Sequence, residues 1–514
     1  MFHRDYPIRQ ANLELDVPKA MWFEYEAFNN GQPDTSFISD ASRKYFFSFA
    51  NLSAAFAEPN GIAWRELPYC VFILHPMDLT YTIPNTLTER PIPQYSLFAE
   101  YRDFTGRSIR LDISQGVNNS ESINMNKFLE NHIGSKPDVS SNLANIEKIH
   151  NLIAQSFIYT NDSAYYKNEI TSGPDFGESS RGGVLREFYR YEPYKYMLEK
   201  LKQTYYFGYL ADKRSGLISR HYVVPFAQDD YLLLVVKDSA HYDIIYPKFQ
   251  KAGYYYNEIP FYYEGTDVAS VHFTDYYLDP KNQRELPDSL FLSKTPKSDI
   301  LENSRKFTSL VTVLTSDGKM KFQTKGFLSG QFSTLGRGSY LNNEIHPFAD
   351  PAYAHRIFDI PGAKMLNPRP VYNQTAEKPF KFTIECSYET VLDNKSGEIN
   401  IAVRDWFPFV LPQAGQYQRT TNLYTDFLFT DTYIYQLVFD KDVKLSTIPQ
   451  DINIDNAFGK LFFSVRQVDG KTITISAQLI LNHEMLRPEK ISNLNELSDA
   501  VTAINDLVLM FKYN

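Results

Sequence analysis

Thiol chemistry is the first chemistry to test against these residues, because a cysteine thiolate is a strong nucleophile in acyl transfer. The chain of 514 residues contains two cysteines, Cys70 and Cys386. Cys70 is followed five positions later by His75, within an apolar run that predicts a strand. Residues five apart on a strand lie on opposite faces, about 16 Å from each other. We therefore expect no Cys–His dyad here, and we interpret both cysteines as structural.

Metal binding is the second possibility. His346 and His355 flank a short segment, and Glu344 and Asp350 lie beside them. Imidazole and carboxylate groups can share a metal ion, but this spacing matches none of the tight zinc patterns. We interpret the two histidines as structural or surface residues, and we predict no metal and no cofactor. A hydrolase or transferase that uses these histidines is kept as an alternative.

A second pair of His and acid, His241 with Asp243, is interpreted in the same way. The glycine motifs at 182–183 and 336–338 are typical of turns or loops. Neither motif has the spacing of a phosphate-binding loop, and neither opens a dinucleotide-binding unit after a strand. The glycine pattern therefore indicates no nucleotide site.

Aromatic residues make up 15% of the chain, and they gather at 254–256, 260–265 and 274–279. Such side chains favour half-buried sheet faces, and tyrosine also suits recognition surfaces. Because alternate residues of a strand point to opposite faces, at least half of them are expected to pack inward. The candidate residues for binding a glycan or a peptide are Tyr254, Tyr255, Tyr256, Tyr262 and Tyr263.

The first part of the chain is predicted to be strands. Residues 13–17 alternate apolar and polar side chains, which is the period of a half-buried strand. Residues 44–51 and 69–74 are apolar, aromatic runs between turn signals. The polar segment 114–122 is typical of a loop, and we place a domain boundary near it.

The middle part is predicted to hold two helices followed by an antiparallel sheet, which is an α+β arrangement. The first helix has one apolar face, formed by Leu143, Ile146, Ile149, Ile153 and Phe157. The second is predicted over 191–207, with Pro193 in its first turn. Three short apolar runs separated by turns predict the strands 221–226, 230–236 and 242–247.

The last part, 300–514, is predicted to be mostly strands. The Ser-Asp-Gly sequence at 316–318 predicts a hairpin turn, and 472–481 predicts a strand. We predict a closing helix over 493–513, begun by a capping box of Asn493 and Glu496. Its apolar face would be formed by Leu497, Val501, Ile504, Leu507 and Phe511.

Composition excludes several classes of function. The formal net charge is −9, and no run of Lys or Arg stands out, so we predict no nucleic-acid partner. No segment has about 18 consecutive apolar residues, so no transmembrane helix is expected. The hydrophobic fraction of 43% and the charged fraction of 22% are ordinary for a folded protein.

Several stretches resemble a family of three-part proteins from Bacteroidetes. The resemblance rests on 4–29 and 49–72 in the first part, on 314–340 in the third, and on the ending 472–511. The family combines a DUF3857-type β domain, a transglutaminase-like core and a DUF3858-type β domain. The chain begins about halfway through the family's first domain, and the missing half would carry an export signal.

The resemblance implies an α+β multidomain fold. A transglutaminase-like (papain-like) α+β core would be flanked by two mostly antiparallel β-sandwich-type domains. The expected domains are 1–115, 120–298 and 300–514.

An active core of this family has Cys at a helix start, His at a strand start and Asp on the next strand. The Cys is activated as a thiolate, the His moves the proton, and the Asp orients the ring. On the positions that match this pattern, the chain has Tyr191, Asp230 and Tyr246. No cysteine lies between Cys70 and Cys386. A tyrosine hydroxyl, with a pKa near ~10, is a poor nucleophile without a base, so we expect a vestigial cleft and no catalytic residues.

The expected function is that of a non-catalytic binding or scaffolding protein. The resemblance implies export to the periplasm or cell surface and protein partners in an envelope complex, which could include the outer membrane. A glycan- or peptide-binding protein with aromatic surfaces is the second hypothesis, and a hydrolase or transferase with an unrecognised site is the third.

Overall fold

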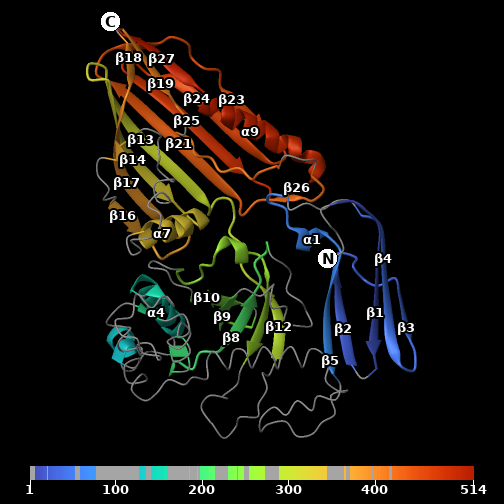
Figure 1. Ribbon diagram of the computed structural model, residues 1–514. Helices are drawn as coiled ribbons and strands as arrows, with labels where there is room; N and C mark the ends of the chain where they lie inside the picture. The colour runs from blue at the N-terminus through green and yellow to red at the C-terminus, as the bar shows by residue number, and fades with distance from the viewer. Residues whose placement is uncertain are drawn as a thin grey trace, which may run out of the picture. The chain divides into compact units, whose positions relative to one another are not determined.

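The computed structural model divides the chain into two compact units, residues 1–297 and 298–514 (Figure 1). The boundary expected near 115–120 lies outside the described residues, so the three-domain division stays a prediction. The structure describes 6–19, 21–52, 58–76, 127–134, 141–156, 158–159, 184–185, 194, 197–198, 200–214, 230–239, 241–247, 254–272, 289–343, 364–365, 371–395, 397–404, 406–415 and 419–513.

The first unit begins with two antiparallel sheets, one of order β1-β4-β3 and one that pairs β2 with β5. Their strands and the short helix before the last of them are β1 (Ile8–Pro18), β2 (Met21–Phe28), β3 (Thr35–Ile38), β4 (Ser42–Leu52), α1 (Ala63–Glu66) and β5 (Tyr69–Pro76). The three strands predicted from alternation and aromatic runs are confirmed within β1, β4 and β5.

Aromatic rings join these two sheets. Phe23 on β2 lies 4.6 Å from Tyr45 on β4, measured between ring centroids. Phe47 on β4 lies 5.8 Å from Phe72 on β5. Aromatic pairs at such distances add to the free energy of area burial, so much of the aromatic content in this part serves packing.

The first unit also contains a five-stranded antiparallel sheet of order β10-β9-β8-β11-β12. Its strands are β8 (Tyr205–Leu210), β9 (Asp230–Val236), β10 (Tyr242–Ile245), β11 (Asp267–His272) and β12 (Ser289–Lys294). The remaining elements of this unit are α4 (Asn142–Ser156), β6 (Ile158–Tyr159), β7 (Val184–Leu185) and the 3-10 helix η5 (Phe261–Tyr263). The helix predicted from the apolar face at 143–157 is confirmed as α4 up to Ser156, with Ile146, Ile149 and Ile153 buried, and Phe157 lies outside the described residues.

The second helix predicted in this part is too long. Residues 194, 197–198 and 200 are helical, but Tyr205–Leu210 form strand β8. The run YYFGYL pairs with β9 and β11, and aromatic residues fit a pleated sheet better than a helix end. Tertiary pairing therefore ends this helix before the predicted position.

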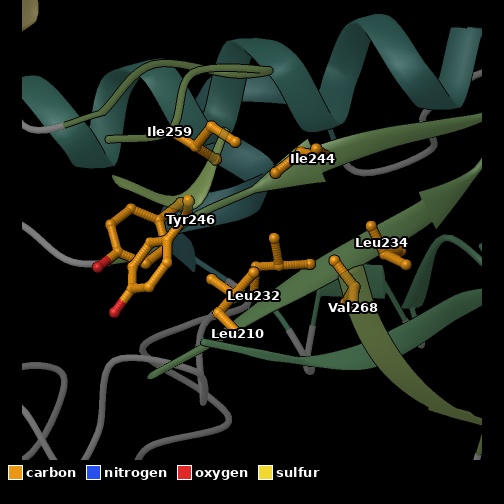
Figure 2. Packing of buried hydrophobic residues seen from close by; sticks show 8 residues of the cluster. Leu210, Leu232, Leu234, Ile244, Tyr246, Ile259 and Val268 are labelled. Carbon is orange, nitrogen blue, oxygen red and sulfur yellow. The ribbon is translucent and has the colours of Figure 1, made fainter. Parts of the chain in front are cut away.

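Strand β9 is buried on both faces, because Leu232, Leu233, Leu234 and Val235 are all at most 3% exposed. A strand that is covered on both sides has a continuous apolar sequence in place of alternation, as DYLLLVV does. Figure 2 shows one of the two faces, where Leu232 and Leu234 pack with residues of β8, β10 and β11.

The second unit is built on a nine-stranded sheet of order β15-β17-β14-β13-β21-β25-β24-β23, with β16 paired to β17. Its strands are β13 (Ser304–Leu314), β14 (Lys319–Leu328), β15 (Lys364–Met365), β16 (Val371–Gln374), β17 (Phe382–Val391), β21 (Phe429–Phe439), β23 (Ile452–Asp455), β24 (Gly459–Gln467) and β25 (Thr472–Leu481). The predicted turn at 316–318 and the predicted strand 472–481 are confirmed.

A four-stranded sheet of order β18-β19-β27-β22 packs against the large sheet, since the rings of Phe439 and Phe511 lie 4.9 Å apart. The remaining elements are α7 (Gln331–Asn343), β18 (Asp393–Lys395), β19 (Glu398–Ala402), β20 (Leu423–Tyr424), β22 (Val443–Leu445), β26 (Met485–Leu486), the 3-10 helix η6 (Pro488–Lys490), α9 (Ile491–Asn505) and β27 (Val508–Tyr513).

The predicted closing helix is wrong in its second half. Helix α9 ends at Asn505, and the last six described residues form β27, paired with β19 and β22. Leu509 and Phe511 are buried while their neighbours are exposed, and this alternation fits a strand. A helix extended through this segment would lose the pairing with both strands.

The expected capping box is also absent from α9. The Asn456 amide instead donates to the Asn493 carbonyl and to Glu496 Oε2, both at 2.9 Å. These two residues therefore hold the helix to the turn before β24. Leu497 and Ile504 are buried, as predicted for the apolar face.

Candidate functional site

The structure places two of the three residues assigned to a vestigial cleft at one end of the five-stranded sheet. Asp230 is the first residue of β9, where it pairs with Leu210. Tyr246 follows directly after β10, whose last residue pairs with Leu233. Because β9 and β10 are antiparallel, both positions lie at the same sheet end. Tyr191 lies outside the described residues, so the three-residue cluster stays a prediction.

Aromatic rings fill the space around Tyr246, which is fully buried. Its ring centroid lies 4.8 Å from Tyr254 and 5.8 Å from Tyr263. Tyr263 continues the series to Tyr262 at 4.6 Å. Figure 2 shows Tyr246 within the apolar cluster of the sheet. A phenol in this setting is a packing group, because neither substrate nor water reaches it.

The tyrosines proposed as a ligand surface divide into two sets. Tyr255, Tyr256 and Tyr263 are at most 5% exposed, so they cannot form an exposed platform. Tyr254 and Tyr262 are half-buried. More of these tyrosines are buried than the alternation of a strand would give. They lie in a turn and a 3-10 helix that pack on the sheet, and not in a strand that has one exposed face.

A basic group covers the exposed end of this aromatic series. The Arg214 guanidinium carbon lies 4.9 Å from the Tyr262 ring centroid and 5.3 Å from that of Phe261. Asp212 holds the same guanidinium through Nε at 3.0 Å and Nη2 at 2.5 Å. An arginine held beside aromatic rings by a carboxylate is pre-organised for further contacts, so this is the part of the sheet end that could meet a ligand.

His150 on α4 is a buried histidine that sequence reasoning missed. Its Nε2 lies 2.9 Å from the Tyr254 carbonyl, which can only accept, so Nε2 carries the hydrogen. Its Nδ1 then accepts from the Tyr194 hydroxyl at 2.8 Å. Burial lowers the pKa of His150 to about 4. With both nitrogens bonded and the ring neutral, His150 joins α4 to Tyr194 and to the segment after β10, and it cannot act as a base in this arrangement.

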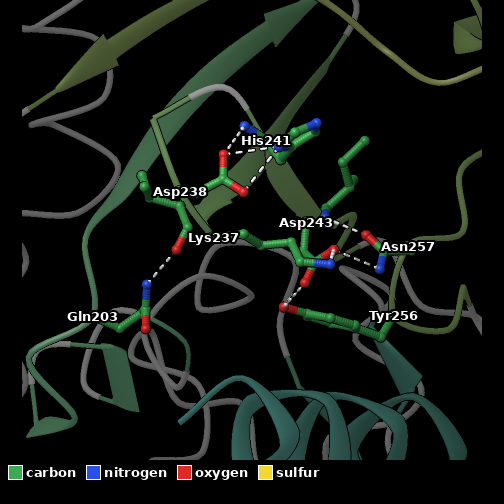
Figure 3. Close-up of polar contacts among 9 residues, drawn as sticks. Gln203, Lys237, Asp238, His241, Asp243, Tyr256 and Asn257 are labelled. Atoms are coloured by element: carbon green, nitrogen blue, oxygen red, sulfur yellow. Dashed lines mark hydrogen bonds and ion pairs between the residues drawn. The ribbon is translucent and has the colours of Figure 1, made fainter. Parts of the chain in front are cut away.

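A polar network surrounds Asp243 on β10 (Figure 3). The carboxylate accepts from the Tyr256 hydroxyl at 3.2 Å and from the Asn257 amide at 2.9 Å. Lys237 Nζ lies 3.4 Å away. Burial and the nearby Asp243 charge raise the pKa of Tyr256. The Asp243 carboxylate has two hydrogen-bond donors and one ammonium group beside it, so we interpret the network as structural.

His241, which the sequence analysis considered together with Asp243, pairs with Asp238 in the structure. The His241 ring lies against Asp238, with Nδ1 at 2.8 and 2.9 Å from its two carboxylate oxygens. Figure 3 shows this pair apart from the contacts of Asp243. Asp238 also accepts from the His241 backbone N–H at 3.0 Å, so the pair closes the turn between β9 and β10.

Asn257 closes the outer edge of the same sheet. Its backbone N–H donates to the Ile244 carbonyl at 2.9 Å, and its side-chain Oδ1 accepts from the Ile244 N–H at 2.7 Å. One residue thus occupies both groups that an added strand would use. Its φ of 63° lies in the left-handed region, which asparagine tolerates well.

We expect Asn257→Gly to lower the free energy of unfolding by about 1–3 kcal/mol, because the Ile244 N–H and Asp243 lose a partner. Glycine tolerates the same φ, so the change isolates the side chain. Asn30→Gly is the matched control, since Asn30 is exposed with the same φ of 63°. Denaturant unfolding would measure both variants. An equal, small effect in the two would show that the Asn257 side chain contributes nothing.

The two cysteines considered in the sequence analysis lie in strands. Cys70 and His75 both lie in β5, and Cys70 is a free cysteine. The Cys70 thiol lies 2.6 Å from the Gly31 carbonyl, and burial raises its pKa to about 11. It is therefore a poor nucleophile at neutral pH. Cys386 lies in β17.

The described residues contain no group of three or more His, Cys, Asp or Glu that could hold a metal ion. The possible metal residues Glu344, His346, Asp350 and His355 lie outside the described residues. None of the described helices has the length and apolar character needed to cross a membrane.

Comparison with known proteins gives a family for part of the second unit. Residues 407–511 match DUF3858, a domain of unknown function with a solved structure. This range covers the strands from β20 to β27, with α9 between them. The match agrees with the third part of the family that the sequence resembles.

The whole chain shares its fold with a crystal structure from Parabacteroides distasonis ATCC 8503 named "putative protease". The TM-score is 0.50 at 12% sequence identity, over 99% of this chain and 74% of that chain. At this identity the similarity concerns the fold alone. No curated protein matches the sequence. The chain is thus a multidomain α+β protein rich in antiparallel sheets that carries a DUF3858 match.

Proposed function

We propose that this chain is a non-catalytic, transglutaminase-like protein that works by binding partners. Tyr246 carries the argument. The family resemblance assigns it the place of the catalytic Asp, and it is fully buried among tyrosine rings. A filled sheet end leaves no room for a substrate carbonyl beside that position.

The composition of the middle part supports the same proposal. No cysteine lies between Cys70 and Cys386, so no thiol is available to a core of this family. The one fully buried histidine in the described part of that region, His150, uses both ring nitrogens in hydrogen bonds. Acyl transfer needs a free base close to the nucleophile, which this histidine does not provide.

Export and an envelope or cell-surface complex complete the proposal. They rest on the family resemblance, which also includes a DUF3857-like first part and a degenerate core. The partner would be a protein of the same compartment, and the aromatic core would keep the shape of the middle part.

Binding of a glycan or peptide at the sheet end is the second candidate. The observation in its favour is Arg214, whose guanidinium carbon lies 4.9 Å from the Tyr262 ring centroid and whose Nε donates to Asp212. A sugar or a peptide carboxylate could meet the exposed part of this guanidinium. A hydrolase or transferase with an unrecognised site is the third candidate. The name "putative protease" describes the structural neighbour, and it assigns no activity to this chain.

We expect the purified protein to show no thiol-dependent turnover. A fluorescent primary amine with a glutamine-containing peptide tests acyl transfer, and labelled casein tests proteolysis. Both rates should equal those of buffer, with and without iodoacetamide. Cys70→Ser is the control for the half-buried thiol. Turnover that iodoacetamide abolishes would contradict the proposal, and turnover that a chelator abolishes would favour the hydrolase.

A further inference from the structure

The chain passes from the first unit to the second between strands β12 and β13. The segment between these strands, 295–303, is described throughout, and its hydrogen bonds show which unit holds each part of it. Two units joined by one chain reorient by rotation about the bonds of the joining segment. The length of chain that neither unit holds therefore limits how far they turn.

The first unit holds the beginning of this segment. Thr295 is 4% exposed, and its hydroxyl donates to the Tyr263 carbonyl at 2.5 Å. Its backbone N–H donates to the Thr266 carbonyl at 3.0 Å, and its Oγ1 accepts from the Thr266 N–H at 2.9 Å. The Pro296 carbonyl accepts from the Gly265 N–H at 3.2 Å. The chain is thus fixed to the first unit as far as Pro296.

The second unit holds the end of the segment through Asn303, which is 0% exposed. The side-chain amide of Asn303 donates to the Leu428 carbonyl at 3.0 Å and to the Ser298 hydroxyl at 2.8 Å. Its Oδ1 accepts from the Gln331 N–H at 2.8 Å, and its carbonyl accepts from the Thr430 N–H at 3.0 Å. Asn303 is therefore bound to the start of α7 and to β21, and it also holds Ser298 to the second unit.

Asp299 folds the residues between these two positions into a closed turn. Its Oδ1 accepts from the backbone N–H of Leu301 at 2.7 Å and from that of Glu302 at 2.9 Å. Its carbonyl accepts from the Asn303 N–H at 3.2 Å. Glu302 Oε2 accepts from the Asp299 N–H at 3.3 Å. An aspartate that binds backbone N–H groups two and three residues further on stabilises a turn, and we call residues 298–303 the Asp299 turn.

We propose that the Asp299 turn is a conformational device that keeps the tether between the two units short. With the turn closed, Lys297 alone separates Pro296, which the first unit holds, from Ser298, which the second unit holds. With the turn open, the tether extends over 297–302, up to the buried Asn303. This proposal goes beyond the proposed binding function and does not depend on it.

Chain statistics give the size of the expected effect. The root-mean-square span of a flexible tether grows as the square root of its number of residues. A tether over 297–302 therefore has about twice the span of Lys297 alone. The distances between a point on one unit and a point on the other should spread in proportion when the turn opens.

The test measures these distances between two nitroxide labels by double electron–electron resonance. Ser239→Cys and Val391→Cys place one label at an exposed position of each unit, and Cys70→Ser with Cys386→Ser removes the native thiols. Asp299→Ala removes the acceptor of the turn, and we expect a distance distribution about twice as wide. Asp299→Asn keeps an oxygen acceptor at this position, so its distribution should match that of the parent.

Hydrogen exchange shows whether the turn has opened. The amides of Leu301 and Glu302 should exchange faster in Asp299→Ala than in the parent or in Asp299→Asn. Asp469→Ala is the matched control, because Asp469 accepts from the backbone N–H of Lys471 at 2.7 Å in an exposed turn of the second unit. This variant should leave the distance distribution unchanged.

A second variant changes the length of the tether directly. Two glycines inserted after Lys297 leave the hydrogen bonds of Thr295 and Asn303 in place. We therefore expect this insertion to widen the distance distribution while the amides of Leu301 and Glu302 keep their protection. The insertion tests the tether even if Asp299→Ala fails to fold.

Four results would overturn the proposal. The first is a turn that stays protected in Asp299→Ala, and the second is an open turn with an unchanged distance distribution. The third is equal widening by Asp469→Ala, which would indicate a general loosening of the second unit. The fourth is an insertion after Lys297 without effect, because contacts other than the tether would then hold the units.

Discussion

Arg305→Met is expected to lower the free energy of unfolding of the second unit by about 3–5 kcal/mol, because it leaves a buried carboxylate without its partner. Arg305 Nε donates to Asp431 Oδ1 at 2.9 Å, and Nη2 donates to Asp431 Oδ2 and to the Pro408 carbonyl. Asp431 is 0% exposed. Burial raises the pKa of the Asp431 carboxyl, and the Arg305 guanidinium opposes that shift.

The surroundings of this pair explain why water cannot replace the lost arginine. The guanidinium carbon lies 4.9 Å from the Phe332 ring centroid and 5.6 Å from that of Tyr433. The Tyr433 hydroxyl donates to Asp431 at 3.2 Å. After substitution this single neutral hydrogen bond would remain for a full negative charge, in a site lined by aromatic rings.

Trp406 provides a reporter for this experiment. The chain has three tryptophans, and Trp406 alone belongs to the second unit, where it is 1% exposed. Its ring packs on Phe322 and Tyr435. In a Trp22→Phe, Trp64→Phe background, urea unfolding followed by fluorescence therefore reports on the second unit alone.

The double variant Arg305→Met, Asp431→Leu is the control. Replacing both partners of a buried ion pair with apolar groups is often neutral or stabilising, so most of the lost stability should return. If the double variant unfolds as easily as Arg305→Met, the loss would come from packing and the argument from an uncompensated charge would be wrong.

The second large effect is a loss of stability of the first unit in acid, which we assign to His150. Burial lowers its pKa from an ordinary 6.5 to about 4. The unfolded chain therefore takes up a proton below about pH 6.5 while the folded chain stays neutral. Stability from this group is complete above pH 6.5 and falls as the pH drops towards 4. The integrated loss is roughly 3 kcal/mol, at 1.36 kcal/mol per pH unit.

Urea titrations at pH 7 and 4.5, read by limited proteolysis with mass spectrometry of peptides from α4, would measure this loss. The control is His150→Gln, which can still donate and accept but does not titrate. It should be less stable than wild type at pH 7 and lose less stability on acidification. The same pH slope in both proteins would show that other groups cause the acid sensitivity.

Alternation of side chains predicted much of the fold directly. In β13 and β14 every second residue is buried. Such a period is visible in the sequence, because the polarity of each side chain indicates whether it faces the core or the solvent. The apolar stripe of α4 was visible for the same reason. The strand at the end of the chain could not be predicted in this way, because Leu507 and Phe511 also fit a helical period. Only the pairing of β27 with β19 shows that this segment is a strand.

The sequence by itself determined that no cysteine lies between Cys70 and Cys386, so this stretch of the chain has no thiol for chemistry. The tertiary structure decided what the other polar groups do. Arg305 and Asp431 are 126 residues apart and meet because β13 and β21 pair in parallel register. His150 meets the Tyr254 carbonyl across 104 residues. Local patterns describe which face a residue occupies, but only long-range register decides which residue lies opposite, and with it the pKa and the accessibility of each group.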